Sequence, residues 1–237
     1  MSHATLAFLI DHTLLRPDAT AKDIDRLCGE ARDYGFGAAF VPPCFLSQAV
    51  RALAGSGVRV GVPVGFPFGY QTTRAKVQEA VDARSQGADE LDVVLNVSWV
   101  KSGAWREVGD ELAGVVAATP GAGHKVILEV GFLTREEILT VCRTAVEARM
   151  EYVKTASGFG PRGATVDDVR LMKEAVAGLA KVKASGGIRD ARAALALLEA
   201  GADRLGTSAG VAIVEEWTRD PDLQHVGRAV LDTRLRL

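Results

Sequence analysis

Two lysines stand in short apolar stretches that each lead into a glycine-rich turn. Lys154 lies in an expected strand over residues 152–156, and Lys183 lies in another over residues 181–184. Burying an ammonium group is costly, so such a lysine tends to lose its proton, and the neutral amine attacks carbonyl carbons. Two lysines that share a pocket also lower each other's pKa by like-charge repulsion. The pair predicts amine chemistry on a carbonyl substrate.

A third charged residue, Asp92, lies in an apolar strand expected over residues 90–95. An ionised carboxylate there needs a partner, and a lysine from a nearby strand would serve. Two structural alternatives remain open, namely a buried ion pair at Asp92 and lysines whose ammonium groups reach solvent at the strand ends. Lys181 and Lys183 share one face of their strand, so one of them must lie deeper. We expect that residue to be Lys183, which is nearer the glycine turn.

The glycine-rich turns predict a phosphate site. Gly186-Gly187 and the Gly206-Thr-Ser208 segment follow two consecutive expected strands. Backbone N–H groups in such turns bind anions, and eight-stranded barrels often bind phosphate after their seventh and eighth strands. Asp11 ends the first expected strand. A structural role in supporting the loop and a role in contacting a substrate are equally compatible with this position.

Strand-like apolar runs recur along the chain at the spacing of one strand–helix unit. They cover residues 7–10, 38–41, 58–64, 90–95, 125–130, 152–156, 181–184 and 204–206. The segments between them carry helical periodicity, and helix starts are expected at Thr20, Thr134 and Thr165. Glycines mark expected helix ends at Gly35, Gly87 and Gly201.

This alternation predicts an α/β fold, a single-domain (β/α)8 TIM barrel that occupies residues 1–237. Near-continuous Val, Leu and Ile runs fit strands that are covered on both faces. An open doubly wound sheet is the alternative. The tail after about residue 217 is polar and mixed, and its place in the fold is not predicted.

Composition excludes several classes of function. The net charge is −2 with no basic run, so nucleic acid and anionic membrane are poor partners. No apolar run is long enough to span a membrane, and the N-terminus lacks a secretory pattern. Cys28, Cys44 and Cys142 are widely spaced, which favours reduced thiols and a cytoplasmic protein.

Two other kinds of site are also disfavoured. The segment Gly158-Phe-Gly-Pro-Arg-Gly163 matches the glycine spacing of a dinucleotide site, but no acidic residue stands at the end of the next strand, where the ribose would need one. The four histidines are scattered and form no ligand pattern for a metal. We therefore expect neither a cofactor nor a metal.

In combination, six motifs resemble the deoxyribose-phosphate aldolase family over residues 8–213, nearly the whole chain. They are Asp11-His-Thr-Leu-Leu15, Val64-Gly-Phe-Pro-Phe-Gly69, Glu90-Leu-Asp-Val-Val-Leu-Asn96, Val153-Lys-Thr-Ala-Ser-Gly-Phe159, Lys183-Ala-Ser-Gly-Gly-Ile-Arg189 and Arg204-Leu-Gly-Thr-Ser208. The resemblance implies a TIM barrel and a metal-free class I aldolase. Such an enzyme reversibly cleaves 2-deoxy-D-ribose 5-phosphate to acetaldehyde and D-glyceraldehyde 3-phosphate.

The resemblance also assigns roles to residues. Lys154 would form the Schiff base, Lys183 would stay charged and keep Lys154 neutral, and Asp92 would move protons. Asp11 and Thr155 would support the site. The phosphate would be held by Ser157, Gly158, Gly186, Gly187, Gly206 and Ser208. Family members often have a second serine where this chain has Ala209, so one hydroxyl group for the phosphate would be missing.

The partners expected from this resemblance are a sugar phosphate, aldehydes and a second copy of the chain in a homodimer. Two other functions remain possible from the residues alone. One is a different Schiff-base lyase or isomerase on the same barrel, and the other is a non-catalytic sugar-phosphate-binding barrel. The binding barrel would leave the two lysines and Asp92 without a purpose.

Overall fold

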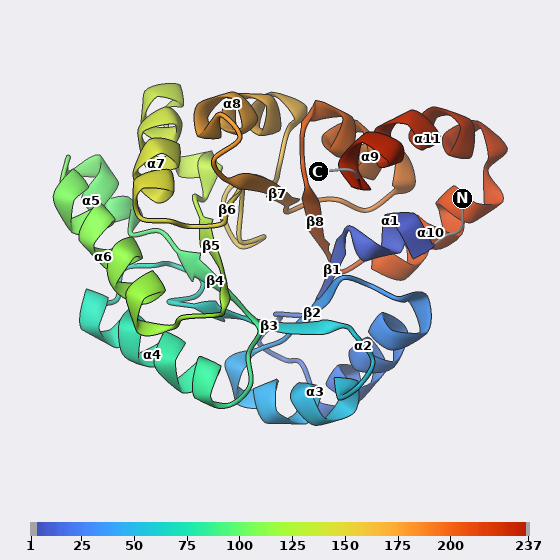
Figure 1. Ribbon diagram of the computed structural model, residues 1–237, viewed down its shortest axis with the longest axis horizontal. Helices are drawn as coiled ribbons and strands as arrows, with labels where there is room; N and C mark the ends of the chain where they lie inside the picture. The colour runs from blue at the N-terminus through green and yellow to red at the C-terminus, as the bar shows by residue number, and fades with distance from the viewer. Residues whose placement is uncertain (1–3, 236–237) are drawn as a thin grey trace.

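A closed barrel of eight parallel strands forms the centre of the molecule, and helices surround it (Figure 1). The computed structural model describes residues 4–235. Each strand pairs with the next one in the chain, and β8 pairs with β1 to close the ring. The predicted (β/α)8 barrel is confirmed, and the alternative of an open sheet is wrong.

Secondary structure alternates along the chain as the apolar spacing predicts. The strands are β1 (Ile10–Thr13), β2 (Ala38–Phe40), β3 (Arg59–Val64), β4 (Glu90–Val94), β5 (Gly123–Ile127), β6 (Tyr152–Lys154), β7 (Lys181–Ser185) and β8 (Arg204–Thr207). The helices are α1 (Ala4–Phe8), α2 (Ala21–Tyr34), α3 (Leu46–Leu53), α4 (Thr73–Ser85), α5 (Val97–Lys101), α6 (Trp105–Ala118), α7 (Arg135–Glu147), α8 (Val166–Val176), α9 (Ala191–Ala200), α10 (Gly210–Arg219) and α11 (Pro221–Leu235). Short 3-10 helices occur at η1 (Pro43–Phe45) and η2 (Val130–Phe132).

The first strand differs from its prediction. Residues 7–10 were expected to be extended, but helix α1 runs through Phe8 and β1 begins at Ile10. The apolar run suits either structure: Leu6 and Ala7 are buried, whereas Phe8 is 54% exposed. A short run without turn residues cannot distinguish a buried helix from a strand. The correction moves Asp11 from the end of the expected strand to the second position of β1.

The fifth strand is also displaced, because it ends at Ile127 rather than at residue 130. Glu129 adopts a left-handed backbone conformation with φ 55° and ψ 58°, which a strand does not contain. Backbone hydrogen bonds to β6 and its following loop nevertheless continue on both sides, from Leu128 N to Lys154 O and from Val130 N to Thr155 O. The chain therefore stays beside β6 while it turns. The other predicted strands agree within two residues.

The helix starts predicted from threonines are confirmed. Thr20, Thr134 and Thr165 each cap a helix, and each pairs reciprocally with the acidic residue three positions later. Gly35 ends α2 with a positive φ of 69°, as a C-terminal glycine should. Gly201 ends α9, whereas Gln86 caps α4 after Ser85 and Gly87 is the next residue.

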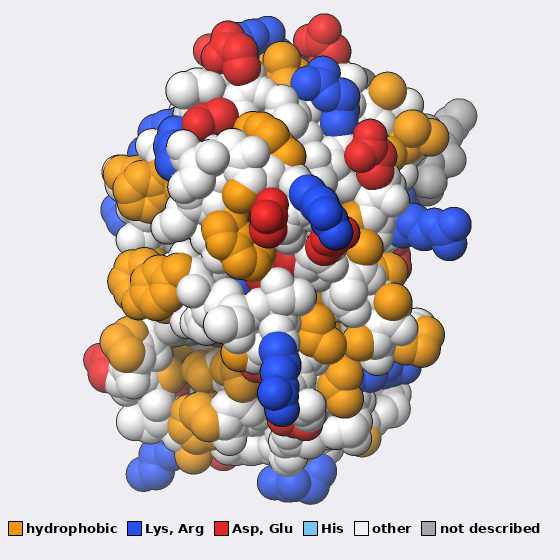
Figure 2. Space-filling view, turned by 90° about the vertical axis from the view of Figure 1, so that its left-hand side faces the viewer, with side chains coloured by type: hydrophobic (Ala, Val, Ile, Leu, Met, Phe, Trp, Pro, Cys, Tyr) orange, Lys and Arg blue, Asp and Glu red, His pale blue; other side chains and the backbone are white. Residues whose placement is uncertain are grey.

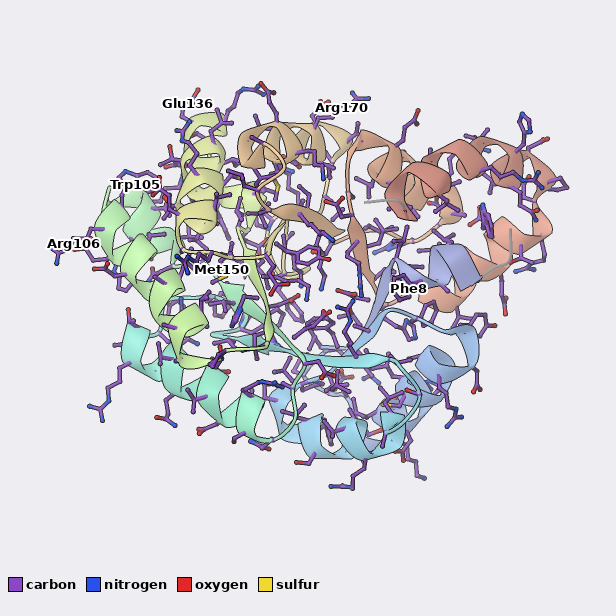
Figure 3. All side chains as sticks on the ribbon, viewed as in Figure 1. Phe8, Trp105, Arg106, Glu136, Met150 and Arg170 are labelled. Atoms are coloured by element: carbon purple, nitrogen blue, oxygen red, sulfur yellow. The ribbon has the colours of Figure 1, made fainter. Side chains whose placement is uncertain are left out.

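Apolar side chains fill the layer between the sheet and the helices (Figure 3). Alternate residues of the strands, such as Leu91, Val126 and Val182, point outward and are completely buried. At the periphery of Figure 3, Arg106, Glu136 and Arg170 extend into solvent. Because these apolar residues face the helices, the residues that alternate with them point into the barrel and include the charged residues described below.

Several expectations concern the surface and the ends of the chain. The tail without a predicted position forms the C-terminal end of α10 and all of α11. The ends of the predicted domain and the start of the N-terminal sequence, residues 1–3 and 236–237, lie outside the described residues. Within the described part, no helix is long and apolar enough to cross a membrane. On the face shown in Figure 2, basic and acidic side chains are interspersed.

Candidate active site

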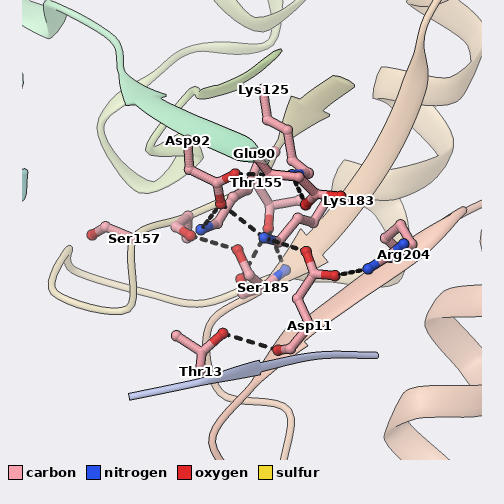
Figure 4. A network of polar contacts seen from close by, with 12 residues as sticks. Asp11, Thr13, Glu90, Asp92, Lys125, Thr155, Ser157, Lys183, Ser185 and Arg204 are labelled. Carbon is pink, nitrogen blue, oxygen red and sulfur yellow. Dashed lines mark hydrogen bonds and ion pairs between the residues drawn. The ribbon is translucent and has the colours of Figure 1, made fainter. Parts of the chain in front are cut away.

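The three residues predicted to carry chemistry meet inside the barrel (Figure 4). The Lys154 Nζ atom from β6 lies 2.7 Å from Asp92 Oδ2. Lys183 Nζ from β7 lies 2.8 Å from the same carboxylate oxygen. All three side chains are buried, with exposed fractions of 4% or less. Lys181, by contrast, is exposed at the start of β7, as expected.

Strand register explains this meeting. Lys154 of β6 lies directly beside Lys183 of β7, and Lys183 lies beside Arg204 of β8. On the other side of the barrel, Asp92 of β4 lies beside Lys125 of β5. Because neighbours in register point to the same face of a sheet, these side chains all enter the barrel. Because the barrel is closed, Asp92 reaches both Lys154 and Lys183.

Asp11 and Thr155 take supporting positions. Asp11 Oδ2 lies 2.6 Å from Lys183 Nζ, and Oδ1 of the same carboxylate forms an ion pair with Arg204. Thr155 Oγ1 donates to the carbonyl oxygen of Ser185 and accepts from the Ser185 N–H group, both at 2.9 Å. Asp11 thus fixes Lys183, and Thr155 joins the ends of β6 and β7.

Electrostatics separate the two lysines. The pKa of Lys154 is lowered to about 8, chiefly by burial; the Asp92 carboxylate opposes this shift, and the neighbouring Lys183 ammonium adds to it. Burial alone would raise the pKa of Asp92, but Lys125, Lys154 and Lys183 outweigh it and hold that pKa far below its usual range. Lys154 is therefore the lysine that can readily become a neutral amine. Burial contributes more than the repulsion from Lys183 that the sequence suggested.

Lys125, Glu90 and Arg204 complete the interior of the barrel, although the sequence did not suggest a role for them. Lys125 Nζ forms an ion pair with Glu90 and lies 3.2 Å from Asp92 Oδ1. Burial opposes the charge on Lys125, but Asp92 and Glu90 together raise its pKa. The signal available in the sequence was the one that identified Asp92, a charged residue in an apolar strand.

The charges around Lys154 balance without it. Among the described residues that fill the barrel, three acids and three bases accompany Lys154, namely Asp11, Glu90, Asp92, Lys125, Lys183 and Arg204. Arg59 also contacts Glu90, but its side chain is 43% exposed and therefore screened by water. A proton on Lys154 would be the excess charge in this interior, which is consistent with its lowered pKa.

The ring of Phe40 lies close to three of the buried lysines. The Lys183 ammonium is 3.8 Å from the centroid of Phe40, and those of Lys125 and Lys154 are 4.8 and 5.7 Å away. The electron-rich face of a ring attracts cations. Gly61, the register partner of Phe40 on β3, leaves room for this ring, since a Cβ atom there would lie 2.3 Å from it.

Gly61→Ala is therefore expected to destabilise the protein by about 1–3 kcal/mol, because the added methyl group displaces Phe40 in a packed interior. Chemical denaturation would measure the change in the free energy of unfolding. Gly29→Ala is the matched control, because Gly29 lies within α2 and a Cβ atom there would meet nothing within 4 Å. That change should be neutral or stabilising. Equal stability of the two variants would contradict the packing of Phe40.

The predicted phosphate residues lie together beside Lys154. A cavity of about 300 Å³ at the barrel mouth is lined by Lys154 and by Ser157, Gly158, Gly186, Gly187, Gly206 and Ser208. Gly186 and Gly187 have φ values of 91° and 78°, which only glycine adopts readily. Arg16 and the exposed Arg189 line the same cavity, and the sequence had not suggested them. The cavity combines the amine of Lys154 with glycine turns and two arginine side chains.

Potential metal ligands and cysteines do not add a second centre. Across residues 4–235, no group of three or more His, Cys, Asp or Glu side chains is arranged to hold a metal ion. Cys28 and Cys142 are buried, Cys44 is exposed, and all three are free thiols. Burial raises the pKa of Cys28 to about 11, which makes it unreactive.

Comparison with known proteins gives one consistent result. A family model described as DeoC/LacD family aldolase matches residues 5–216. A deoxyribose-phosphate aldolase from Thermoanaerobacter sp. (strain X514) is 49% identical over 217 residues, which cover 90% of this chain and 97% of that protein. A deoxyribose-phosphate aldolase from Bacteroides thetaiotaomicron is 47% identical over 219 residues, 92% of each chain.

Solved structures agree with these relatives. A structure described as QR15, an aldolase, superimposes with a TM-score of 0.87 and 41% identity, covering 90% of this chain and 96% of that one. The deoxyribose phosphate aldolase from Aeropyrum pernix, described as having a unique tetrameric structure, superimposes with a TM-score of 0.86 and 34% identity, covering 92% of each chain.

Proposed function

Because the chain belongs to the DeoC/LacD family of aldolases, we propose that it is a deoxyribose-phosphate aldolase that works through a Schiff base at Lys154. It reversibly cleaves 2-deoxy-D-ribose 5-phosphate to acetaldehyde and D-glyceraldehyde 3-phosphate. The observation that carries the proposal is the buried amine of Lys154, which lies 2.7 Å from Asp92 and lines a cavity together with the Gly186-Gly187 turn and Arg189.

The first half of the mechanism forms the covalent intermediate. The neutral amine of Lys154 attacks C1 of the open-chain sugar, and loss of water leaves a protonated imine. This imine carries the positive charge that the amine lacked, and the Asp92 carboxylate faces it. The C3 hydroxyl then loses its proton, the C2–C3 bond breaks, and the electron pair moves to the imine nitrogen as an enamine. D-glyceraldehyde 3-phosphate leaves.

The second half returns the enzyme to its starting state. The enamine takes a proton at C2, and water hydrolyses the resulting imine to release acetaldehyde and regenerate Lys154. We assign the proton transfers to Asp92 acting with Lys183 through a water molecule. The strongly lowered pKa of Asp92 makes it a weak base alone, so the assignment is to the pair of residues rather than to the carboxylate. Asp11 and Arg204 hold Lys183 in place.

The direct test is retro-aldol cleavage of 2-deoxy-D-ribose 5-phosphate, followed by coupled detection of D-glyceraldehyde 3-phosphate. Turnover should be the same with and without a chelator, because the lysine provides the electron sink. Turnover that a chelator abolishes would overturn the metal-free mechanism. Cleavage of other phosphorylated carbonyl compounds, with none of this substrate, would instead favour a different Schiff-base lyase.

The pH dependence of kcat/KM should report the amine of Lys154. Since the reactive form is neutral, kcat/KM is expected to fall about tenfold per pH unit below a pKa of about 8 and to level off above it. Initial rates at low substrate concentration, measured in buffers on both sides of that value, would reveal this limb. A profile that stays level down to pH 6 would contradict the proposed ionisation.

The phosphate group should contribute mainly to binding. Deoxyribose without phosphate is expected to show a KM raised by about 100-fold or more, because it loses charge-assisted hydrogen bonds to the cavity edge. Arg189→Ala should raise the KM for the phosphorylated substrate and leave the unphosphorylated one unchanged. Arg192, also exposed but absent from the cavity lining, provides the control variant Arg192→Ala. Equal effects of Arg189→Ala on both substrates would place the phosphate elsewhere.

The proposal also covers the assembly of the enzyme and its location in the cell. We propose a homodimer in the cytoplasm, supported by the family resemblance and by the three free thiols. The related Aeropyrum pernix enzyme is described as tetrameric, so light scattering of the purified protein distinguishes the two assemblies. A tetramer in solution would replace the dimer.

A further inference from the structure

Glu129 stands just behind the proposed active site without a part in the mechanism given above. We propose that Glu129 is a positioning residue that fixes Ser157 as a hydrogen-bond acceptor for the substrate hydroxyl between the reacting carbon and the phosphate. That group is the C4 hydroxyl of the sugar and the C2 hydroxyl of D-glyceraldehyde 3-phosphate. This inference rests on the proposed function and assigns Ser157 to the hydroxyl rather than to the phosphate.

The placement of Glu129 is specific and comes at a conformational cost. Its backbone is left-handed at φ 55°, a conformation that costs a residue other than glycine about 1–3 kcal/mol. The side chain is only 4% exposed. Gly160 lies directly against the carboxyl group, since a Cβ atom there would be 2.5 Å from Glu129 Cδ. The loop after β6 therefore wraps closely around this carboxylate.

The carboxylate determines what the Ser157 hydroxyl can do. Ser157 donates its hydroxyl hydrogen to Glu129 Oε2, and its backbone N–H group donates to the same oxygen at 3.2 Å. The backbone N–H group of Phe159 donates to Ser157 Oγ at 3.0 Å. A hydroxyl has one hydrogen and two acceptor positions. One acceptor position therefore remains on Ser157 Oγ, and no hydrogen.

Such an oxygen suits a hydroxyl and not a phosphate. Phosphate oxygens accept hydrogen bonds, and a serine whose hydrogen is already used offers them nothing. The Glu129 carboxylate behind it also repels an anion. A sugar hydroxyl, in contrast, can donate to Ser157 Oγ. The Glu129 carboxylate itself is buried and does not line this cavity, so Ser157 Oγ is the acceptor that the substrate can reach.

The position of Ser157 in the cavity agrees with this role. Ser157 lines the same cavity as Lys154, three residues earlier, whereas Gly186, Gly206 and Ser208 come from the loops after β7 and β8. A substrate bound to Lys154 through C1 places its phosphate, at the other end, against these later loops. C4, which lies between C1 and the phosphate, is then next to Ser157. The phosphate lies on the side of the cavity away from the Glu129 carboxylate.

The test compares two acceptors in the aldol direction, with acetaldehyde as the donor. D-glyceraldehyde 3-phosphate carries the hydroxyl, and 3-oxopropyl phosphate has the same aldehyde and phosphate without it. The wild-type enzyme should prefer the first acceptor in kcat/KM, mainly through KM. Ser157→Ala should reduce that preference by about 10- to 100-fold, and Ser157→Thr should keep it. Ser208→Ala is the matched control, because it should weaken both acceptors by the same factor.

Variants of Glu129 separate its role from that of Ser157. Glu129→Met has no acceptor for the Ser157 hydrogen and should lose the preference, whereas Glu129→Gln retains an acceptor oxygen and should keep much of it. Borohydride trapping of acetaldehyde on Lys154 should be unchanged in both, since that step does not involve the hydroxyl.

The possible outcomes are distinct. Equal losses of kcat/KM for both acceptors in Ser157→Ala would overturn the proposed hydrogen bond from the substrate hydroxyl to Ser157. A folded Glu129→Met variant that keeps the preference would overturn positioning by Glu129. If Glu129→Met does not fold, the Ser157 variants still decide whether Ser157 binds the substrate hydroxyl. Glu129→Asp, which retains the carboxylate on a shorter side chain, then tests the positioning of Ser157. A wild-type enzyme without aldol activity on either acceptor would refute the proposed function instead.

Discussion

Replacing Lys154 with methionine is expected to reduce retro-aldol turnover by about 10⁴-fold or more, because no other described side chain at this position can form the imine. Methionine retains the length of the side chain and relieves the excess charge in the barrel, so the variant should fold. Incubation with acetaldehyde and borohydride, followed by peptide mass spectrometry, should find an ethyl group on Lys154 of the wild-type protein and none at that position in the variant.

The trapping result also separates an enzyme from a sugar-phosphate-binding barrel. A binding protein would give no stable adduct, although it would still bind deoxyribose 5-phosphate. An adduct on Lys183 or Lys125 in the wild-type protein, with Lys154 unmodified, would contradict the assignment of the nucleophile.

The second large effect is expected for Lys183→Met. The Lys183 ammonium lowers the pKa of Lys154, and it also shares Asp92 Oδ2 with it at 2.8 Å. Without Lys183, Lys154 no longer competes with a second ammonium group for the Asp92 carboxylate. The pKa of Lys154 therefore rises, and a smaller fraction of its amine is neutral at pH 7. We expect a loss in kcat/KM of about 10²- to 10⁴-fold near neutral pH. The acidic limb of the pH profile should move to higher pH, and activity should recover in part there.

Lys181→Met is the matched control, since Lys181 lies two residues earlier on the same strand but is exposed. It should keep wild-type activity and an unchanged pH profile. If Lys183→Met retained full activity at neutral pH, the electrostatic role of Lys183 would be wrong. If its activity fell without any shift of the profile, Lys183 would act in proton transfer alone.

The three central residues were predictable because each breaks a local rule. A lysine or an aspartate in an apolar strand is unusual wherever both faces of that strand are covered. Lys125 and Arg204 break the same rule, but each is the first residue of the strand expected from the sequence, where a long basic side chain commonly reaches water. Only closure of the barrel shows that these two side chains turn inward. The sequence therefore led to the reacting amine more readily than to the ions that surround it.

The contacts around Glu129 show a different limit. Glu129 and Ser157 are separated by 28 residues, and their hydrogen bond depends on a left-handed turn that no sequence pattern marked. Residues 125–130 formed one apolar run with a single acid near its end, which favoured an uninterrupted strand. The fold was easier to predict than this turn, because strand-helix periodicity is repeated along the whole chain, whereas the turn occurs at a single position.

The ionic filling of the barrel has a consequence for protein engineering. Stabilising campaigns commonly fill interiors with larger aliphatic groups, but below Lys154 a lone apolar replacement leaves a buried counter-ion unpaired, a loss of about 3–5 kcal/mol. Exchanges there would have to be made in matched pairs, such as Glu90 with Lys125. Improvements in heat resistance are better sought in the outer layer between sheet and helices. That layer is built mainly of apolar side chains, so substitutions there leave the ions around Lys154 in place.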